Sequence, residues 1–164
     1  MKKAPDNVME IFLQPGEFFF SDRDTRIRTI LGSCVAVVLW HPRFLIGGMC
    51  HYMLPGGRKS KRGEELDGKY ADDAMLLFMQ ELGKTGTKPK DYIVKMFGGG
   101  NQFPGKTHAA AMSVPDRNVE VGHELLAHHG FALKAEHLGG NGHRNVVFDV
   151  WTGDVWMKHV HKEG

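Results

Sequence analysis

Short alternating and apolar runs along the chain predict β-strands, and two segments with helical spacing predict helices. Besides the long apolar segment from Thr29 to Pro55, strands are expected at 8–13, 92–97, 131–135, 145–150 and 155–160. Helices are expected at 70–82 and at 117–129, the second with Asp116 as its N-cap, and the Phe18–Phe20 triplet is expected to be buried. The pattern predicts an α+β fold: a layered sandwich of short, mostly antiparallel strands with two main helices packed on it.

The segment from Thr29 to Pro55 is organised as two apolar strands about a His-Pro-Arg-Phe turn. If the turn is centred between residues 42 and 43, residues whose numbers sum to 85 face each other. Cys34 then lies opposite His51, with Cβ atoms about 4.5–5.5 Å apart. Cys50 would oppose Val35 and point to the other face. A bulge at residues 47–48, both glycine, would shift this register by one residue.

Composition and charge favour a globular protein and give no indication of a nucleic-acid-binding or membrane protein. The 164 residues are 41% hydrophobic and 24% charged, which predicts one globular domain over 1–164. A net charge of +2, from 21 basic and 19 acidic residues, gives no indication of nucleic-acid binding. Glu10, Pro15 and Glu17 interrupt the early apolar run, so no signal peptide or membrane span is expected there. With two cysteines and no secretory signal, free thiols in a reducing cytoplasm are expected.

A thiol beside an imidazole is the minimal arrangement for nucleophilic catalysis by cysteine. A free thiol has a pKa of about 8.5, and a neighbouring histidine takes its proton and later returns it. Cys34 follows Gly32 and Ser33 at the start of a strand, where small neighbours leave the sulfur approachable. The alternative is that Cys34 is a small buried apolar residue and His51 an ordinary core residue.

Three other segments of the sequence resemble a metal site, a phosphate-binding loop and a basic surface loop. His123 and His128 lie five residues apart on a predicted helix, which turns the second about 140° away from the first, so no metal site is expected. Residues 100–107 match the phosphate-binding pattern G-x-x-x-x-G-K-[ST], but only a short stretch precedes Pro115 and no series of βαβ units is predicted. We interpret this match as a glycine loop at a strand end. Residues 56–63 form a basic loop, either solvated or a rim beside His51.

Three blocks of sequence resemble one family in order and over nearly the whole chain. The first is LGSCVAVVLWHP with GGMCHYMLP, the second is KMFGGGNQF at 95–103, and the third is LGGNGHRNVVFDVWTGDVWMK at 138–158. They are similar to the CheD family, the chemoreceptor glutamine deamidases of bacterial chemotaxis. The resemblance implies a cysteine amidohydrolase that converts a glutamine side chain to glutamate and ammonia.

The resemblance also implies roles for particular residues. Cys34 would be the nucleophile, His51 the general base and acid, and Thr29 the family's third catalytic residue. The backbone N–H of Cys34 and the Ser33 hydroxyl are candidate oxyanion donors. Gly98 and Asn101, at the two ends of a glycine-rich segment, would line the pocket beside the thiol. No cofactor and no metal is expected.

The implied partners are proteins. The substrate would be the cytoplasmic helices of chemoreceptors, and a CheC-type phosphatase would be a second partner at the same surface. Neither nucleic acid nor direct insertion into a membrane is expected. Two alternatives stay open at this point: a non-catalytic CheC-binding regulatory module and a P-loop nucleotide binder.

Overall fold

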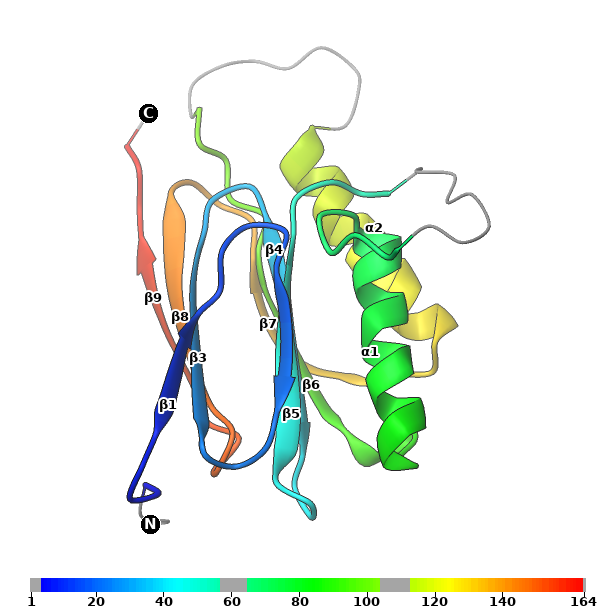
Figure 1. The fold of residues 1–164 in the computed structure, drawn as a ribbon. Helices are drawn as coiled ribbons and strands as arrows, with labels where there is room; N and C mark the ends of the chain where they lie inside the picture. Colours follow the sequence, from blue (N-terminus) through cyan, green and yellow to red (C-terminus); the bar gives the residue numbers. More distant parts are fainter. Residues whose placement is uncertain (1–3, 57–64, 104–112, 164) are drawn as a thin grey trace.

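Two β-sheets and a pair of helices form three layers in the computed structural model, which describes residues 4–56, 65–103 and 113–163 (Figure 1). One sheet has the strand order β1-β3-β8-β9 and the other β2-β5-β4-β6-β7. The strands are β1 Met9–Phe12, β2 Phe18–Ser21, β3 Thr25–Leu31, β4 Val35–His41, β5 Ile46–Tyr52, β6 Ile93–Gly98, β7 Leu133–Leu138, β8 His143–Asp149 and β9 Val155–Val160. The helices are α1 Ala71–Thr85, α2 Val114–His128 and the short 3-10 helix η1 Pro89–Asp91.

This architecture confirms the predicted α+β sandwich of mostly antiparallel strands. Two pairings are parallel, β1 with β3 and β6 with β7. The sequence predicted no series of βαβ units, and among the described residues one such unit forms, β6-α2-β7. The strand expected at 131–135 corresponds to β7, which pairs with β6 in the parallel sense. Parallel neighbours need a crossover connection, and α2 provides it by returning the chain to the end of the sheet where β6 begins.

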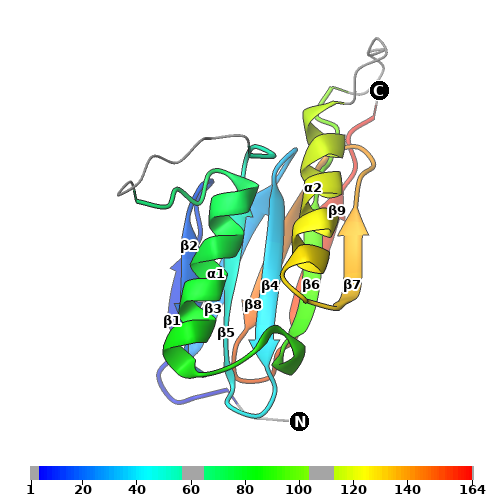
Figure 2. The same ribbon diagram turned by 90° about the vertical axis from the view of Figure 1, so that its right-hand side faces the viewer.

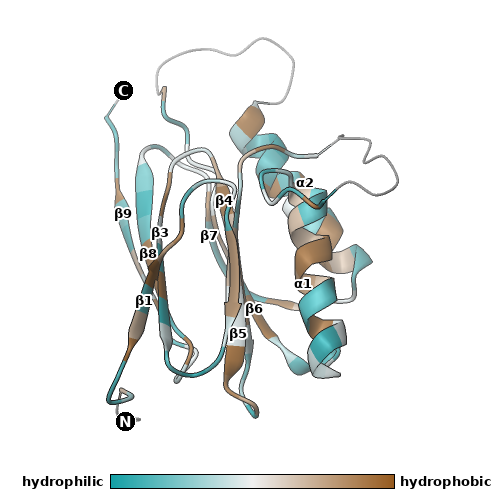
Figure 3. Cartoon of the chain, in the orientation of Figure 1, coloured by the Kyte–Doolittle hydropathy of each residue, from teal (hydrophilic) through white to brown (hydrophobic). Residues whose placement is uncertain are grey.

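The five-stranded sheet is covered on both faces. Figure 2 looks from the helix side, where α1 and α2 lie side by side over this sheet. One apolar cluster, which includes Val37, Cys50 and Phe78, fills the space beneath the helices. A second, which includes Ala36, Met49 and Phe148, lies between the two sheets. Because β4 contacts both clusters, its run of apolar residues is continuous rather than alternating, and the apolar colour in Figure 3 follows β4 and β5.

The hairpin of β4 and β5 has a different register from the one predicted. Paired residues sum to 87 rather than 85, so Ala36 faces His51 and Val37 faces Cys50. The predicted direct pair of Cys34 with His51 is therefore wrong. A shift of two in the sum preserves the alternation of faces. Cys34 still packs on the cluster between the sheets, whereas Cys50 lies in the cluster under the helices, as predicted.

The turn of the hairpin explains the shift. The loop spans residues 42–45, and Leu45 has a positive φ of 54°. The His41 Nδ1 atom accepts the backbone N–H groups of Arg43 and Phe44, at 3.2 and 3.0 Å. This side chain replaces backbone acceptors inside the turn, so the loop is centred one residue later than in a tighter turn. The segment from Thr29 to Leu31 belongs to β3, in the other sheet.

The two glycines in β5 do not form a bulge, because pairing with β4 continues through both. Their role is close approach of the backbones. A Cβ on Gly48 would lie 2.5 Å from the carbonyl oxygen of Phe19, and one on Gly47 would collide with the carbonyl of Leu39. Glycine therefore lets β5 lie between its neighbours without a steric conflict.

The apolar triplet and the second helix differ in detail from the prediction. Phe18–Phe20 forms most of β2, an edge strand whose side chains are half-buried rather than buried. Helix α2 begins at Val114 instead of near residue 117, since the Ser113 side chain accepts the N–H of Asp116 and is the true N-cap. Pro115 lies in the first turn, where its missing N–H costs no hydrogen bond.

Candidate active site

The residues predicted to act together lie at one end of the five-stranded sheet, the upper end in Figure 1. Thr29 comes from β3 of the other sheet, and Cys34 from the short connection that carries the chain to β4. His51 is the last residue but one of β5. The site is thus assembled where the chain crosses from one sheet to the other.

Thr29 and His51 are joined by a buried hydrogen bond between the sheets. The Thr29 Oγ1 atom lies 2.7 Å from His51 Nδ1 and donates to the carbonyl oxygen of Leu13 at 2.8 Å. A hydroxyl has one proton to donate, and here Leu13 takes it, so the His51 Nδ1–H must be the donor to Thr29. This assignment leaves the Nε2 atom of neutral His51 as a free acceptor. That atom is buried and has no hydrogen-bond partner among the described residues.

His51 is an unusually weak base. Its side chain is 1% exposed, and burial lowers the pKa of the imidazole to about 4, although the carboxylate of Glu17 acts in the opposite sense. The folded protein therefore holds His51 neutral at physiological pH. A neutral imidazole with a free Nε2 atom is the form that accepts a proton from a nucleophile.

This shift predicts a pH-dependent part of the stability. The pKa of His51 is about 4 in the folded state and 6.5 for an unperturbed imidazole, so the unfolded chain binds more protons between these values. The contribution is complete above pH 6.5 and is lost as the pH falls from 6.5 through 4, by up to about 3 kcal/mol. Urea unfolding of the wild type and His51→Gln across this range measures it. The stability advantage of the wild type should shrink on acidification, and a constant difference would contradict the prediction.

Cys34 is half-buried and its thiol is neutral at rest. Burial raises the pKa of the thiol, and a hydrogen bond with the Ser33 side chain partly offsets this. The thiol makes no hydrogen bond with His51 Nε2. In the observed register Cys34 is a diagonal rather than a direct neighbour of His51, and such pairs have Cα atoms about 7–8 Å apart. The two groups are therefore neutral and lie on the same face, without a hydrogen bond between them.

The glycine-rich end of β6 holds the backbone of Cys34. The Gly99 N–H donates to the Cys34 carbonyl oxygen at 2.9 Å, and the Gly100 N–H donates to Gly32 at the same distance. Gly98 has a φ of 121°, and a Cβ at this position would collide with the Cys34 carbonyl oxygen. Glycine is therefore required at Gly98 both by the backbone conformation and by the closeness of Cys34.

The predicted lining and oxyanion residues differ in what they contact: Ser33 and Gly98 lie beside Cys34, whereas the backbone of Asn101 is hydrogen-bonded to Gly140 and Gly142. The Ser33 hydroxyl interacts with the thiol. Gly98 contributes only backbone, and its carbonyl accepts the N–H of Gly139. The Asn101 side-chain oxygen accepts the N–H of Phe103, so this residue shapes its own turn. Of these three residues, Ser33 is the one whose side chain contacts the Cys34 thiol.

Arg144 supports the site and was missed from the sequence. It is 1% exposed, and its guanidinium donates to the carbonyl oxygens of Gly98 and Gly139 at 3.2 and 2.6 Å and to His137 Nδ1 at 2.9 Å. These bonds fasten the glycine segment behind Cys34. The sequence did contain an indication of this burial, because position 144 has the same parity as Val146 and Phe148, which point inward from β8. A charge on the buried face of a strand indicates a structural or functional role.

The nucleotide-binding alternative meets a direct obstacle. A phosphate cradle needs free backbone N–H groups, but those of Gly100 and Asn101, the first two residues of the motif, donate to Gly32 and Gly140. Residues 104–107 of the motif lie outside the described residues. Among the described residues, the first helix after the motif is α2, which begins at Val114. The predicted basic rim over 57–63 also lies outside the described part of the chain.

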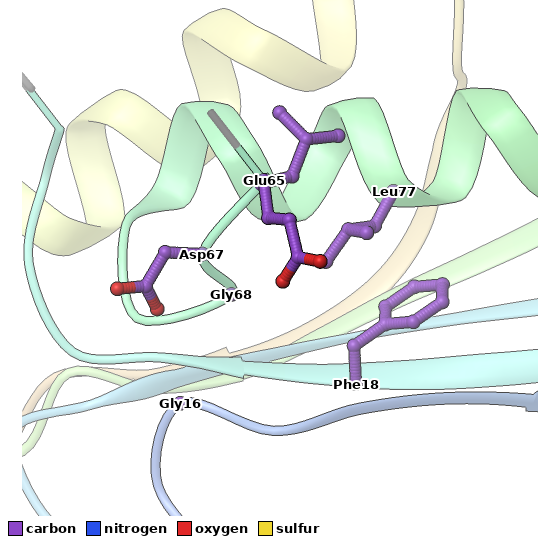
Figure 4. Close-up of a pocket in the computed structure, with 7 residues that line it drawn as sticks. Gly16, Phe18, Glu65, Asp67, Gly68 and Leu77 are labelled. Atoms are coloured by element: carbon purple, nitrogen blue, oxygen red, sulfur yellow. The ribbon is translucent and has the colours of Figure 1, made fainter. Parts of the chain in front are cut away.

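Two of the pockets among the described residues lie away from the site, and these two are not lined by Cys34, His51 or Thr29. One of about 590 Å³ lies between α1 and β2, with Phe18, Glu65, Asp67 and Leu77 around it (Figure 4). The other, of about 400 Å³, lies beside Arg26 and Trp151. Within 4–56, 65–103 and 113–163, no group of three or more His, Cys, Asp or Glu side chains is arranged to hold a metal ion. No helix in these ranges is long and apolar enough to cross a membrane.

Comparison with known proteins gives consistent matches. Residues 53–159 match the family model described as CheD chemotactic sensory transduction. The chain is 50% identical over 157 residues to a probable chemoreceptor glutamine deamidase CheD 3 of Dechloromonas aromatica, covering 96% of this chain and 91% of that one. A probable chemoreceptor glutamine deamidase CheD of Pseudomonas savastanoi is 49% identical over 95% of this chain and 88% of its own. A Leptospira interrogans relative with the same activity in its name is 39% identical over 94% and 95%.

Proposed function

Because this chain belongs to the CheD family, we propose that it hydrolyses glutamine side-chain amides of bacterial chemoreceptors through a Cys34–His51 mechanism. The observation that carries the proposal is the buried Thr29–His51 hydrogen bond, which leaves His51 Nε2 bare on the face where Cys34 lies. An acceptor without a donor, on the same face as a partly exposed thiol, is the pair of groups that nucleophilic amide hydrolysis requires.

The reaction begins with both groups neutral. When a glutamine carboxamide enters, His51 Nε2 takes the thiol proton as the Cys34 sulfur attacks the amide carbon. The tetrahedral oxyanion is stabilised by the backbone N–H of Cys34 and by the Ser33 hydroxyl. Its collapse breaks the C–N bond, and the proton on His51 passes to the departing nitrogen to give ammonia. A water molecule, deprotonated by His51 Nε2, then attacks the thioester carbon. This step releases glutamate, and the proton returns from His51 to the Cys34 sulfur to restore the free thiol.

Thr29 has the part of an orienting group. It holds the imidazole ring in one orientation and tautomer, and it accepts the Nδ1–H whether His51 is neutral or protonated. A neutral hydroxyl stabilises the imidazolium less than a carboxylate would. This fits the low pKa of His51, which makes the protonated state short-lived and favours its transfer of the proton to ammonia.

The partners follow from the same proposal. The substrate is a glutamine on a receptor helix, so the surface around Cys34 receives a protein rather than a small molecule. The relatives named above carry chemoreceptors in their names as the molecules they act on. A CheC-type phosphatase is the second partner that membership of the family suggests, and it would compete with receptors for this surface.

The test is direct deamidation in vitro. Purified protein is incubated with cytoplasmic fragments of chemoreceptors from the same cell, and peptides are searched by mass spectrometry for glutamine converted to glutamate, with ammonia release measured in parallel. Conversion at defined glutamines, abolished by prior alkylation of the protein with iodoacetamide, is the expected result. Absence of conversion on every receptor, together with binding of a CheC-type phosphatase, would favour the regulatory module. Tight binding of Mg-ATP that is lost in Lys106→Ala would favour the nucleotide binder.

A further inference from the structure

The buried face of α2 carries one polar residue that packing does not explain. The buried residues of this helix are Asn118, Gly122 and Leu126, spaced four apart on one side. An apolar side chain at position 118 would suit this buried face, as Leu126 does two turns later. Asn118 is instead completely buried, and a buried amide costs free energy unless its groups are hydrogen-bonded. A polar residue in such a stripe is therefore the informative one.

The Asn118 amide bridges the two chain segments that carry the nucleophile and the base. Its Nδ2 atom donates to the carbonyl oxygen of Ser33 at 3.2 Å and to that of Met53 at 3.0 Å. Ser33 immediately precedes Cys34, and Met53 follows His51 by two residues. Both neighbours are acceptors, so a flipped amide would set its oxygen against two carbonyls. The buried Oδ1 atom has no hydrogen-bond partner among the described residues, so the amide is held through its N–H groups.

The bridge lies where the hairpin stops. The last backbone pair between β4 and β5 is Val35 with Tyr52, and in the same register the next pair would be Cys34 with Met53. That pair does not form. The N–H groups of Met53 and Leu54 donate instead to the Lys69 carbonyl oxygen, at 2.8 and 3.1 Å. Asn118 thus connects the segments that precede β4 and follow β5, at the first position where backbone hydrogen bonds no longer pair them.

Two further contacts make this corner of α2 rigid. The Tyr52 hydroxyl donates to the Asn118 carbonyl oxygen at 2.5 Å, which fastens the helix to the residue next to His51. One turn later, a Cβ on Gly122 would lie 2.5 Å from the same hydroxyl and would collide with the Met96 side chain. Glycine at 122 therefore lets α2 approach closely enough for the short Asn118 side chain to reach both strands.

We propose that Asn118 is a positioning residue that sets the separation of the Cys34 thiol and the His51 imidazole. This inference rests on the proposed deamidase function for its catalytic meaning. The thiol and imidazole are diagonal neighbours with no direct bond in the structure, so their separation depends on the backbone segments that carry them. Without the amide, the backbone hydrogen bonds that remain to the Cys34 connection among the described residues come from the β6 side, from Gly99 and Gly100.

The test compares wild type with Asn118→Ala and with Asn118→Asp, which keeps the shape but replaces the two N–H donors with a carboxylate. A displacement of about 1 Å at a reacting group can cost about 100-fold in rate. We expect kcat on a receptor fragment to fall about 10- to 100-fold, with KM changed by less than about threefold. The rate of Cys34 alkylation by iodoacetamide, followed against pH, should approach the profile of His51→Gln.

Thr87→Val is the matched control. Thr87 is also buried and hydrogen-bonds to the Tyr92 hydroxyl at 2.8 Å, but it lies beside the start of β6, at the opposite end of that strand from Gly98. This variant should lose thermal stability and keep both kcat and the alkylation profile. If the Asn118 variants lose stability alone, or lose kcat while Cys34 alkylates as in the wild type, the positioning role is overturned. If the wild type deamidates no receptor, the proposed function fails, and the alkylation profiles still decide the role of Asn118.

Discussion

Cys34→Ala is expected to lose receptor deamidation by at least about 10⁴-fold, because removal of a nucleophile leaves only binding and oxyanion stabilisation. The chain holds two cysteines, and the structure separates them clearly. Cys34 is partly exposed at the start of β4. Cys50 is buried under the helices, where burial raises its pKa to about 12 and keeps it protonated.

Cys50→Ala is therefore the matched control for the nucleophile. It removes a thiol from the same hairpin but from the opposite face of the sheet, and it should retain kcat with a loss of stability of about 1–2 kcal/mol from the space left behind. Rates are measured by mass spectrometry of the receptor peptides, with urea unfolding to confirm that both variants are folded. Deamidation by Cys34→Ala at a rate near that of the wild type would exclude the thiol mechanism.

His51→Gln is expected to lower kcat by about 10²–10⁴-fold, the range that a general base contributes. Glutamine fills much of the same space but accepts no proton at neutral pH. The same substitution should slow alkylation of Cys34, because the thiol loses the neutral acceptor that helps to remove its proton. Both effects come from the bare Nε2 atom that the Thr29 hydrogen bond leaves available.

His123→Gln is the control for loss of a histidine. His123 lies on α2 with its Nε2 atom 2.6 Å from Glu136, on the exposed surface and apart from the β3-to-β4 connection. Its kcat should stay within about twofold of wild type, as expected for surface substitutions. A His51→Gln protein that is folded and keeps more than about a tenth of the wild-type kcat would remove His51 from the role of base.

The Cys34 thiol and the His51 imidazole are both neutral in the resting protein, which affects how reactive the thiol is before substrate binds. In many cysteine enzymes a thiolate is stabilised before substrate arrives, by a nearby positive charge. Here burial raises the pKa of Cys34 and lowers that of His51, so both shifts favour thiol and imidazole over the ion pair. In the proposed mechanism proton transfer then waits for the substrate, and we expect the protonated resting thiol to react slowly with oxidants and alkylating agents.

The sequence predicted much of the local structure and much less of the assembly. The helix expected at 70–82 corresponds to α1, Ala71–Thr85, because its apolar spacing and its terminal signals lie within one segment. The order of the hairpin strands was also predicted. Their register was not, because it depended on the His41 side chain inside the turn and because a continuous apolar run on β4 has no alternation to select one register.

What the sequence determined by itself is the membership of a family and the faces on which the two cysteines lie. Alternation along a strand is a local property, so a register error of two residues left Cys34 and His51 on one side and Cys50 on the other. Only the tertiary structure joined Thr29 to His51 across two sheets and placed Arg144 and Asn118 behind Cys34. These contacts join residues up to 85 positions apart, and no local pattern specifies them. They depend on how the layers pack, which is decided by the whole chain.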